Sequence, residues 1–149
     1  MLNGSFEELR DKALEDLGKI YDVRAKTLQH TIKDETSIER FWKVKTEIEI
    51  YDKAVDIEFI VKFDTDFPLS FPNIYLSDDD YKLYYNLPHI DSNKFICTFD
   101  KQVSRPDFNN PSGVLYQSIV QAKKIIKDGV EQKNIQDYEP EFIAYLKTS

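Results

Sequence analysis

The sequence predicts an α+β fold with an N-terminal helix, a four-stranded antiparallel meander, an irregular segment and C-terminal helices. Near both ends of the chain, apolar residues recur at steps of three and four, whereas they alternate with polar residues over residues 40–63. Residues 81–111 show no regular period. We expect residues 1–149 to form a single domain, because a chain of 149 residues can bury a core without disulfides.

A first helix is expected over residues 5–24. Ser5 and Glu8 have the spacing of a capping box at its start. One face of this helix is apolar and carries Phe6, Leu9, Ala13, Leu17 and Ile20. A short strand is expected next at residues 27–33, followed by a polar segment at residues 34–39.

A β-hairpin with one solvated face is expected over residues 40–63, with its turn at residues 51–54. The apolar side of its first strand carries Trp42, Val44, Thr46, Ile48 and Ile50, and that of its second strand carries Val55, Ile57, Phe59, Val61 and Phe63. Because one face of this hairpin is apolar, it needs a cover, and the first helix is the nearest candidate.

Two prolines, Pro68 and Pro72, end the hairpin and precede a fourth strand at residues 73–77. The acidic run at residues 78–80 is expected to be a solvated turn. It is not expected to bind a metal, because calcium loops need further spaced oxygen ligands and a glycine.

Two helices are expected in the C-terminal part. One begins at Pro111, ends near Gly129 and buries one face that carries Leu115, Ile119, Ala122 and Ile126. A last short helix begins near Pro140 and buries Phe142, Tyr145 and Leu146.

Charge and composition exclude several classes of function. The net charge of −7 argues against general nucleic-acid binding, which needs a basic face. No signal peptide and no apolar run long enough to span a membrane is recognisable, so we expect a cytoplasmic protein with no membrane partner. The single cysteine cannot form an internal disulfide. No cofactor is expected, and no nucleotide-binding glycine loop is present in the sequence.

Two motifs resemble the ubiquitin-conjugating enzyme superfamily. In that family a Tyr/Phe-Pro-x-x-Pro-Pro turn follows the third strand, and residues 67–72 (FPLSFP) match it except at Phe71. The family also carries the pattern HPN-I-x-x-x-G-x-I-C, and residues 87–97 (LPHIDSNKFIC) keep its spacing, with Cys97 in the place of the catalytic cysteine. The resemblance implies a ubiquitin-conjugating-enzyme-like fold over nearly the whole chain.

The departures from these motifs resemble the divergent bacterial members of the superfamily. His89 stands where the family has asparagine, Leu87 where it has histidine and Lys94 where it has glycine, and no tryptophan follows Cys97. Some bacterial members occur in CBASS antiphage operons beside a cGAS-like nucleotidyltransferase, whose C-terminus they attach to targets. By this analogy, the expected role is protein conjugation in antiviral defence.

The resemblance implies that Cys97 is the nucleophile that forms a thioester with the C-terminal carboxyl group of a protein and passes it to an amine. The implied donor is a ubiquitin-like protein or the C-terminus of a cGAS-like nucleotidyltransferase, and a protein amine is the acceptor. An activating enzyme, or a donor activated elsewhere, would have to supply the activated carboxyl group. The His89 side chain could donate an N–H to the oxyanion, act as a base on the amine, or only tie down its loop.

Two other functions are compatible with the sequence. The chain could be a catalytically inactive binding module that keeps the fold, although the presence of Cys97 argues against this. A cysteine hydrolase built from Cys97 and His89 is the third possibility, but no orienting third residue is recognisable. A Cys97 sulfur sealed inside the core would exclude the enzyme hypotheses.

Overall fold

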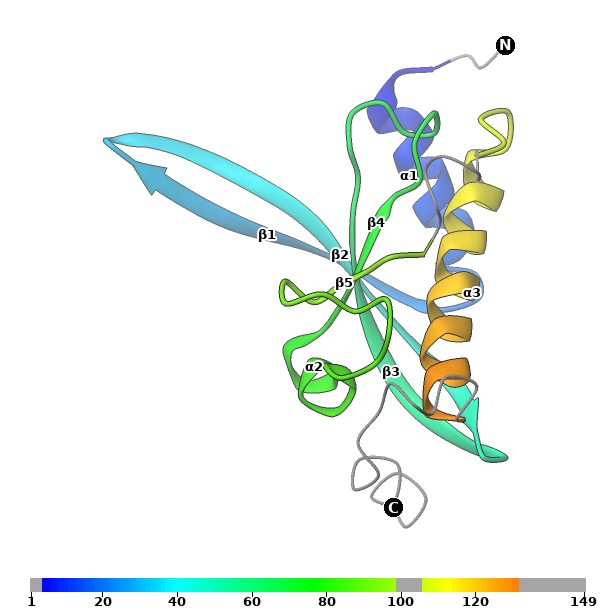
Figure 1. Ribbon diagram of the computed structural model, residues 1–149. Coiled ribbons are helices and arrows are strands. Elements are labelled where there is room, and N and C mark those ends of the chain that lie inside the picture. Colours follow the sequence, from blue (N-terminus) through cyan, green and yellow to red (C-terminus); the bar gives the residue numbers. More distant parts are fainter. Residues whose placement is uncertain (1–3, 99–105, 132–149) are drawn as a thin grey trace.

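Two helices cover one face of a five-stranded antiparallel sheet (Figure 1). The computed structural model describes residues 4–98 and 106–131. The elements are α1 (Phe6–Leu17), β1 (Asp22–Ile32), β2 (Glu35–Ile50), β3 (Lys53–Lys62), β4 (Asn73–Leu76), α2 (Asp78–Tyr84), β5 (Phe95–Ile96) and α3 (Pro111–Val130). The strands follow one another in sequence order, so the predicted meander is confirmed, with β5 as an additional strand.

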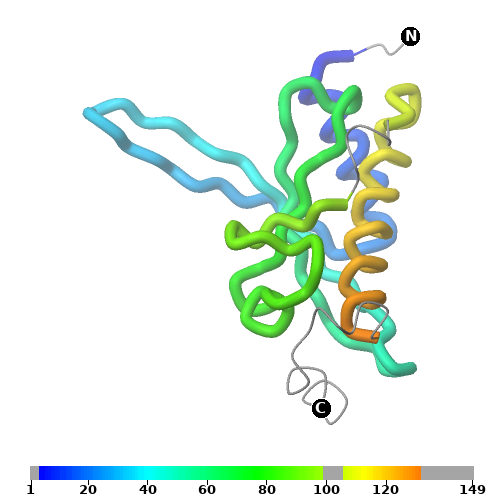
Figure 2. Tube along the Cα trace, in the orientation of Figure 1, coloured from blue at the N-terminus to red at the C-terminus, as the bar shows by residue number. Residues whose placement is uncertain are grey.

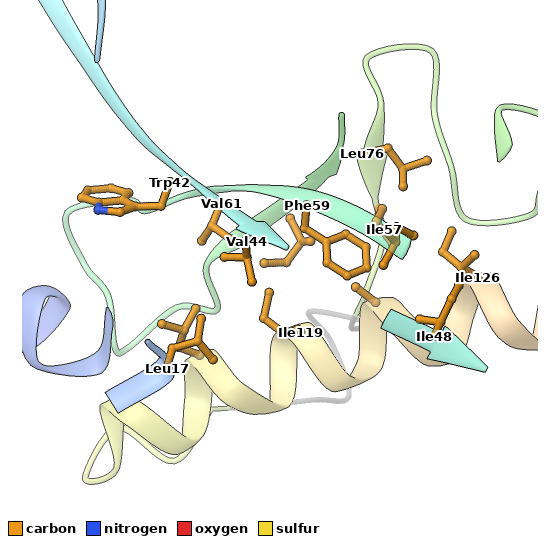
Figure 3. Close-up of a cluster of buried hydrophobic side chains, with 14 of the residues drawn as sticks. Leu17, Trp42, Val44, Ile48, Ile57, Phe59, Val61, Leu76, Ile119 and Ile126 are labelled. Atoms are coloured by element: carbon orange, nitrogen blue, oxygen red, sulfur yellow. The ribbon is translucent and has the colours of Figure 1, made fainter. Parts of the chain in front are cut away.

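The core lies between the sheet and α3, with α1 packed alongside α3. Alternate residues of β2 and β3 point into it, as the period of two predicts, and helix α3 supplies the opposite wall (Figure 3). The fully or nearly fully buried side chains include Leu17, Val44, Ile57, Phe59, Val61, Leu115, Ile119, Ala122 and Ile126. The main cover of the hairpin is therefore α3, and α1, which we expected to cover it, lies at the side.

Helix α1 is shorter than expected. Its start is confirmed, because the Ser5 hydroxyl accepts a hydrogen bond from the Glu8 backbone N–H at 3.2 Å. The helix ends at Leu17, with Gly18 as its C-cap, rather than near residue 24. Ile20 continues the apolar spacing but lies in the following turn and is 60% exposed. The sequence predicted a longer helix because this exposed isoleucine fits the apolar spacing of the helix by chance.

Strands β1 and β2 form a hairpin that projects from the body of the molecule (Figures 1 and 2). Residues 26–41, which we call the arm, pair only with each other among the residues that the structure describes, because the pairing of β2 with β3 begins at Trp42 and Val61. Lys33 and Asp34 form its two-residue turn with φ values of 51° and 64°, as in a type I′ hairpin. Of the expected polar segment at residues 34–39, Asp34 lies in this turn and residues 35–39 are strand.

The acidic run at residues 78–80 is the first turn of helix α2 and not a free turn. Ser77 caps this helix by accepting a hydrogen bond from the Asp80 N–H at 3.2 Å. Acidic side chains are favourable at this end because the helix dipole is positive there. The Asp80 carboxylate also accepts the Glu58 N–H at 2.7 Å, and burial raises the pKa of Asp80. The run thus joins α2 to β3.

Side-chain hydrogen bonds tie both ends of α3 to the rest of the domain. Near its start, the Ser112 hydroxyl donates to the Asp16 carboxylate at 2.6 Å. At its end, the Tyr51 hydroxyl donates to the Val130 carbonyl at 2.6 Å, which holds the β2–β3 turn. The predicted range of this helix is confirmed to within one residue of Gly129. The predicted helix near residue 140 lies outside the described residues.

Candidate functional site

Cys97 follows β5 directly, and its side chain is exposed. Successive side chains of an extended segment point to opposite faces, and the preceding Ile96 is fully buried against the core. The sulfur is therefore carried on the outer side of a segment that the core anchors. A buried sulfur, the outcome that would have excluded the enzyme hypotheses, is not what the structure shows.

A tight turn at residues 91–95 precedes β5. The Asp91 carboxylate accepts the N–H groups of Asn93 at 2.8 Å and of Phe95 at 3.0 Å. Lys94 has a φ of 70°, and its carbonyl accepts the Leu76 N–H at 2.8 Å. The turn is thus hydrogen-bonded to β4.

His89 lies beside Cys97 through a backbone contact. The His89 carbonyl accepts the Cys97 N–H at 2.9 Å, and an isolated bridge pairs Ile90 with Ile96. The φ of His89 is 68°, a left-handed conformation in which asparagine, aspartate and histidine are enriched among residues with a side chain. Both His89 and Cys97 have exposed side chains. The structure therefore brings the two predicted residues together.

The loop that carries His89 is anchored by buried apolar side chains. Leu87 is 3% exposed and donates its N–H to the Tyr84 carbonyl at 3.1 Å. Tyr84 is fully buried, and burial raises the pKa of its hydroxyl to about 12. Leu87 therefore has a packing role at the position where the resembled family has histidine.

An ion pair that the sequence did not indicate lies next to the turn. The Lys94 ammonium is 2.7 Å from the Asp78 carboxylate, and this hydrogen bond lowers the pKa of Asp78. The two residues are distant in sequence, so no spacing pattern could have revealed the contact. Of two further residues near Cys97 in sequence, Asn109 lies in the turn before α3, and Asp100 is outside the described residues.

The described part of the chain contains no group of three or more histidine, cysteine, aspartate or glutamate side chains placed to hold a metal ion. In the same residues, no helix is both long and apolar enough to cross a membrane.

The geometry of the site is accompanied by a family match. Residues 20–149 match the family described as prokaryotic E2 family B. The chain belongs to this family. It is thus a bacterial ubiquitin-conjugating-like protein, and its mixed α+β architecture is the corresponding E2-like fold. The region matched includes the whole sheet, α3 and the segment that carries Cys97.

Comparison with solved structures gives a distant similarity. The crystal structure of the yeast vps23 UEV domain in complex with a vps27 PSDP peptide is 14% identical in sequence, with a TM-score of 0.40. The alignment covers 78% of this chain and 91% of the yeast chain. This similarity is too distant to transfer the role of any residue. No curated protein matches the sequence significantly.

Proposed function

We propose that this family B protein is a conjugating enzyme that carries an acyl group as a thioester on Cys97. The observation that supports the proposal most is the exposed cysteine next to the buried Ile96 in an E2-like chain. Only a thiol that a macromolecular donor can reach is able to accept its C-terminus, and Cys97 lies on the surface. The hydrogen bond from the Cys97 N–H to the His89 carbonyl holds that segment in place.

The proposed reaction has two acyl-transfer steps. The Cys97 thiolate attacks an activated C-terminal carbonyl, so that a carbon–sulfur bond forms and the bond to the donor's leaving group breaks. An amine then attacks the thioester, a carbon–nitrogen bond forms, the thiolate leaves and the amine proton passes to a base or to water. Thiolates are strong nucleophiles, and a cysteine with an ordinary pKa of about 8.5 is ionised to a few per cent at neutral pH.

The His89 ring could act in the second step. Its exposed side chain is on the loop bonded to Cys97, where a ring N–H would stabilise the oxyanion or a neutral ring would accept the amine proton. The left-handed backbone at position 89 also suits asparagine, the residue of the resembled family.

The direct test is intact-mass analysis of the protein incubated with its donor, an activating enzyme and ATP. We expect an adduct of the donor's mass minus one water on the wild-type protein, removed by excess thiol and absent from Cys97→Ala. Cys97→Lys should give a thiol-resistant amide. If neither adduct forms with cognate partners, the proposal is wrong, and full biological function of Cys97→Ala would instead favour a binding module.

We further propose that the donor is a ubiquitin-like protein or a cGAS-like nucleotidyltransferase, with a role in antiphage defence. The support is the resemblance to bacterial conjugating proteins of antiphage operons. Co-expression with each donor class from neighbouring genes, followed by phage challenge of wild type and Cys97→Ala, tests this assignment. Equal phage resistance of the two strains would contradict it. A peptide released from the donor without any activating enzyme would indicate a hydrolase.

A further inference from the structure

A cavity of about 490 Å³ lies where the arm leaves the body of the molecule. Its lining includes Arg10 of α1, Ile38, Arg40 and Trp42 of β2, Lys62 of β3 and Phe63 of the β3–β4 connection. We call this cavity the notch. It exists because β3 ends at Lys62 whereas β2 extends outward into the arm, so a gap opens beside the first residues of β2.

The backbone that borders the notch is an unpaired strand edge. In an antiparallel ladder, residues bond alternately to the strand on either side. Ile32 and Glu35 flank the two-residue turn and bond to each other, so the even-numbered residues of β2 direct their N–H and C=O groups away from β1. From Trp42 inward these groups meet β3, whereas those of Thr36, Ile38 and Arg40 meet no strand in the described part of the chain. Such an edge is a template for one more extended chain.

Arg40 supplies an exposed positive charge beside this edge. Lys62 is neutralised by Glu39 at 2.9 Å. Arg10 bonds to Asp11 through Nε at 2.9 Å, and its guanidinium lies 4.9 Å over the Trp42 ring. Among the described residues, no ion pair involves the exposed Arg40, whereas Arg10 is paired with Asp11 and its side chain is only 9% exposed. Arginine forks of this kind match carboxylates.

The notch also offers apolar contacts. Ile38 is 64% exposed, and Trp42 and Phe63 form an edge-to-face pair with ring centroids 5.4 Å apart. The Asp64 carboxylate also lines the notch and accepts an amide hydrogen bond from Asn73 at 3.4 Å. A bound carboxylate is therefore expected at Arg40 and away from Asp64, because like charges repel.

We propose that the notch binds an extended, acidic segment of a partner protein, added as a strand beside residues 36–40. The segment hydrogen-bonds to the free backbone groups of Ile38 and Arg40, places a carboxylate at Arg40 and packs an apolar side chain on Ile38. The outer edge of β1 is also unpaired within the described residues, but the cavity lined by Trp42 and Phe63 lies on the β2 side. The binding does not need Cys97, so it is independent of the proposed conjugation activity.

The test begins with selection of a phage-displayed random octapeptide library on the full-length protein. We expect enriched peptides with alternating acidic and apolar residues that retain their affinity for Cys97→Ala. Arg40→Gln should weaken their binding at least about tenfold, because a charge-assisted hydrogen bond is lost. Arg24→Gln is the matched control, since Arg24 lies on β1 and is paired with Asp22, and it should change the affinity less than twofold.

Residue-resolved amide exchange identifies the edge that is used. A bound peptide should slow exchange at Ile38 and Arg40, and N-methylation of alternate peptide amides should abolish binding. Protection at Thr27 and Gln29 would place the peptide on β1 and overturn the proposal. Failure to enrich acidic peptides, or equal affinity for wild type and Arg40→Gln, would also overturn it.

Discussion

Truncation of Ile96 should destabilise the domain and release the segment that carries Cys97. The Ile96 side chain is fully buried, and β5 consists of only two residues. Ile96→Ala removes three carbons, which corresponds to about 2.4 kcal/mol of lost transfer free energy at about 0.8 kcal/mol per carbon. The cavity left behind adds to this, so we expect a loss of about 3–5 kcal/mol in the free energy of unfolding.

Ile119→Ala is the matched control, because Ile119 is equally buried but lies on α3. Urea unfolding followed by the fluorescence of Trp42 should show a loss of similar size for both variants. Hydrogen exchange should separate them, since only Ile96→Ala should speed exchange at the Cys97 amide, which is bonded to His89. A cost below about 1 kcal/mol for Ile96→Ala, or equal exchange at Cys97 in both variants, would refute the view that burial of Ile96 holds the site.

Three further predictions concern other contacts. The hydrogen bond from Ser112, followed by those from Lys19 and Lys12, lowers the pKa of Asp16 from 3.8 to about 2. The stabilisation by the ionised carboxylate is therefore present above about pH 4 and is lost as the pH falls towards 2. The difference in melting temperature between wild type and Asp16→Asn should shrink over that range. Tyr51→Phe should cost about 0.5–1.5 kcal/mol in urea unfolding, because the Val130 carbonyl loses its donor. At position 89, His89→Asn should keep much of the rate of thioester discharge to an amine, whereas His89→Ala should not.

Matched variants isolate these effects. Asp56→Asn is the control for Asp16→Asn: it removes an exposed carboxylate elsewhere and should leave the fall of the melting temperature at low pH unchanged. Tyr85→Phe is the control for Tyr51→Phe, because Tyr85 is 54% exposed. His89→Gly adopts the φ of 68° without strain, whereas alanine does not, so glycine is the cleaner deletion of the ring. Equal rates of thioester discharge for the wild type, His89→Asn and His89→Gly would show that the side chain at position 89 takes no part in the mechanism.

The half-buried strands and α3 could be predicted because burial imposes a period on their residues. Val44 and Ile57 alternate with charged neighbours, and Ile119 recurs with the turn of the helix. The arm has no such constraint, since both of its faces are solvated, and its length was therefore underestimated. Helix α2 was missed because seven residues give no period, and its start at Asp78 resembles an acidic turn.

The site was predictable only in part. The spacing of residues 87–97 indicated Cys97 and His89, and the structure places them side by side. The contact itself depends on the left-handed backbone at His89 and on a bond between main-chain groups, neither of which leaves a pattern in the side chains. The pair between Lys94 and Asp78 is invisible for the same reason, because the fold alone brings the two residues together.

Trp42 is the only tryptophan of the chain, and it stands at the base of the arm with the Arg10 guanidinium over its ring. The native protein therefore carries an intrinsic optical probe at one defined place, and no label has to be introduced there. A charge that draws Arg10 away from the indole would change the emission without any unfolding. Titrations followed by this signal can thus separate local events at the arm from global denaturation, provided that a second observable, such as far-ultraviolet circular dichroism, is recorded alongside.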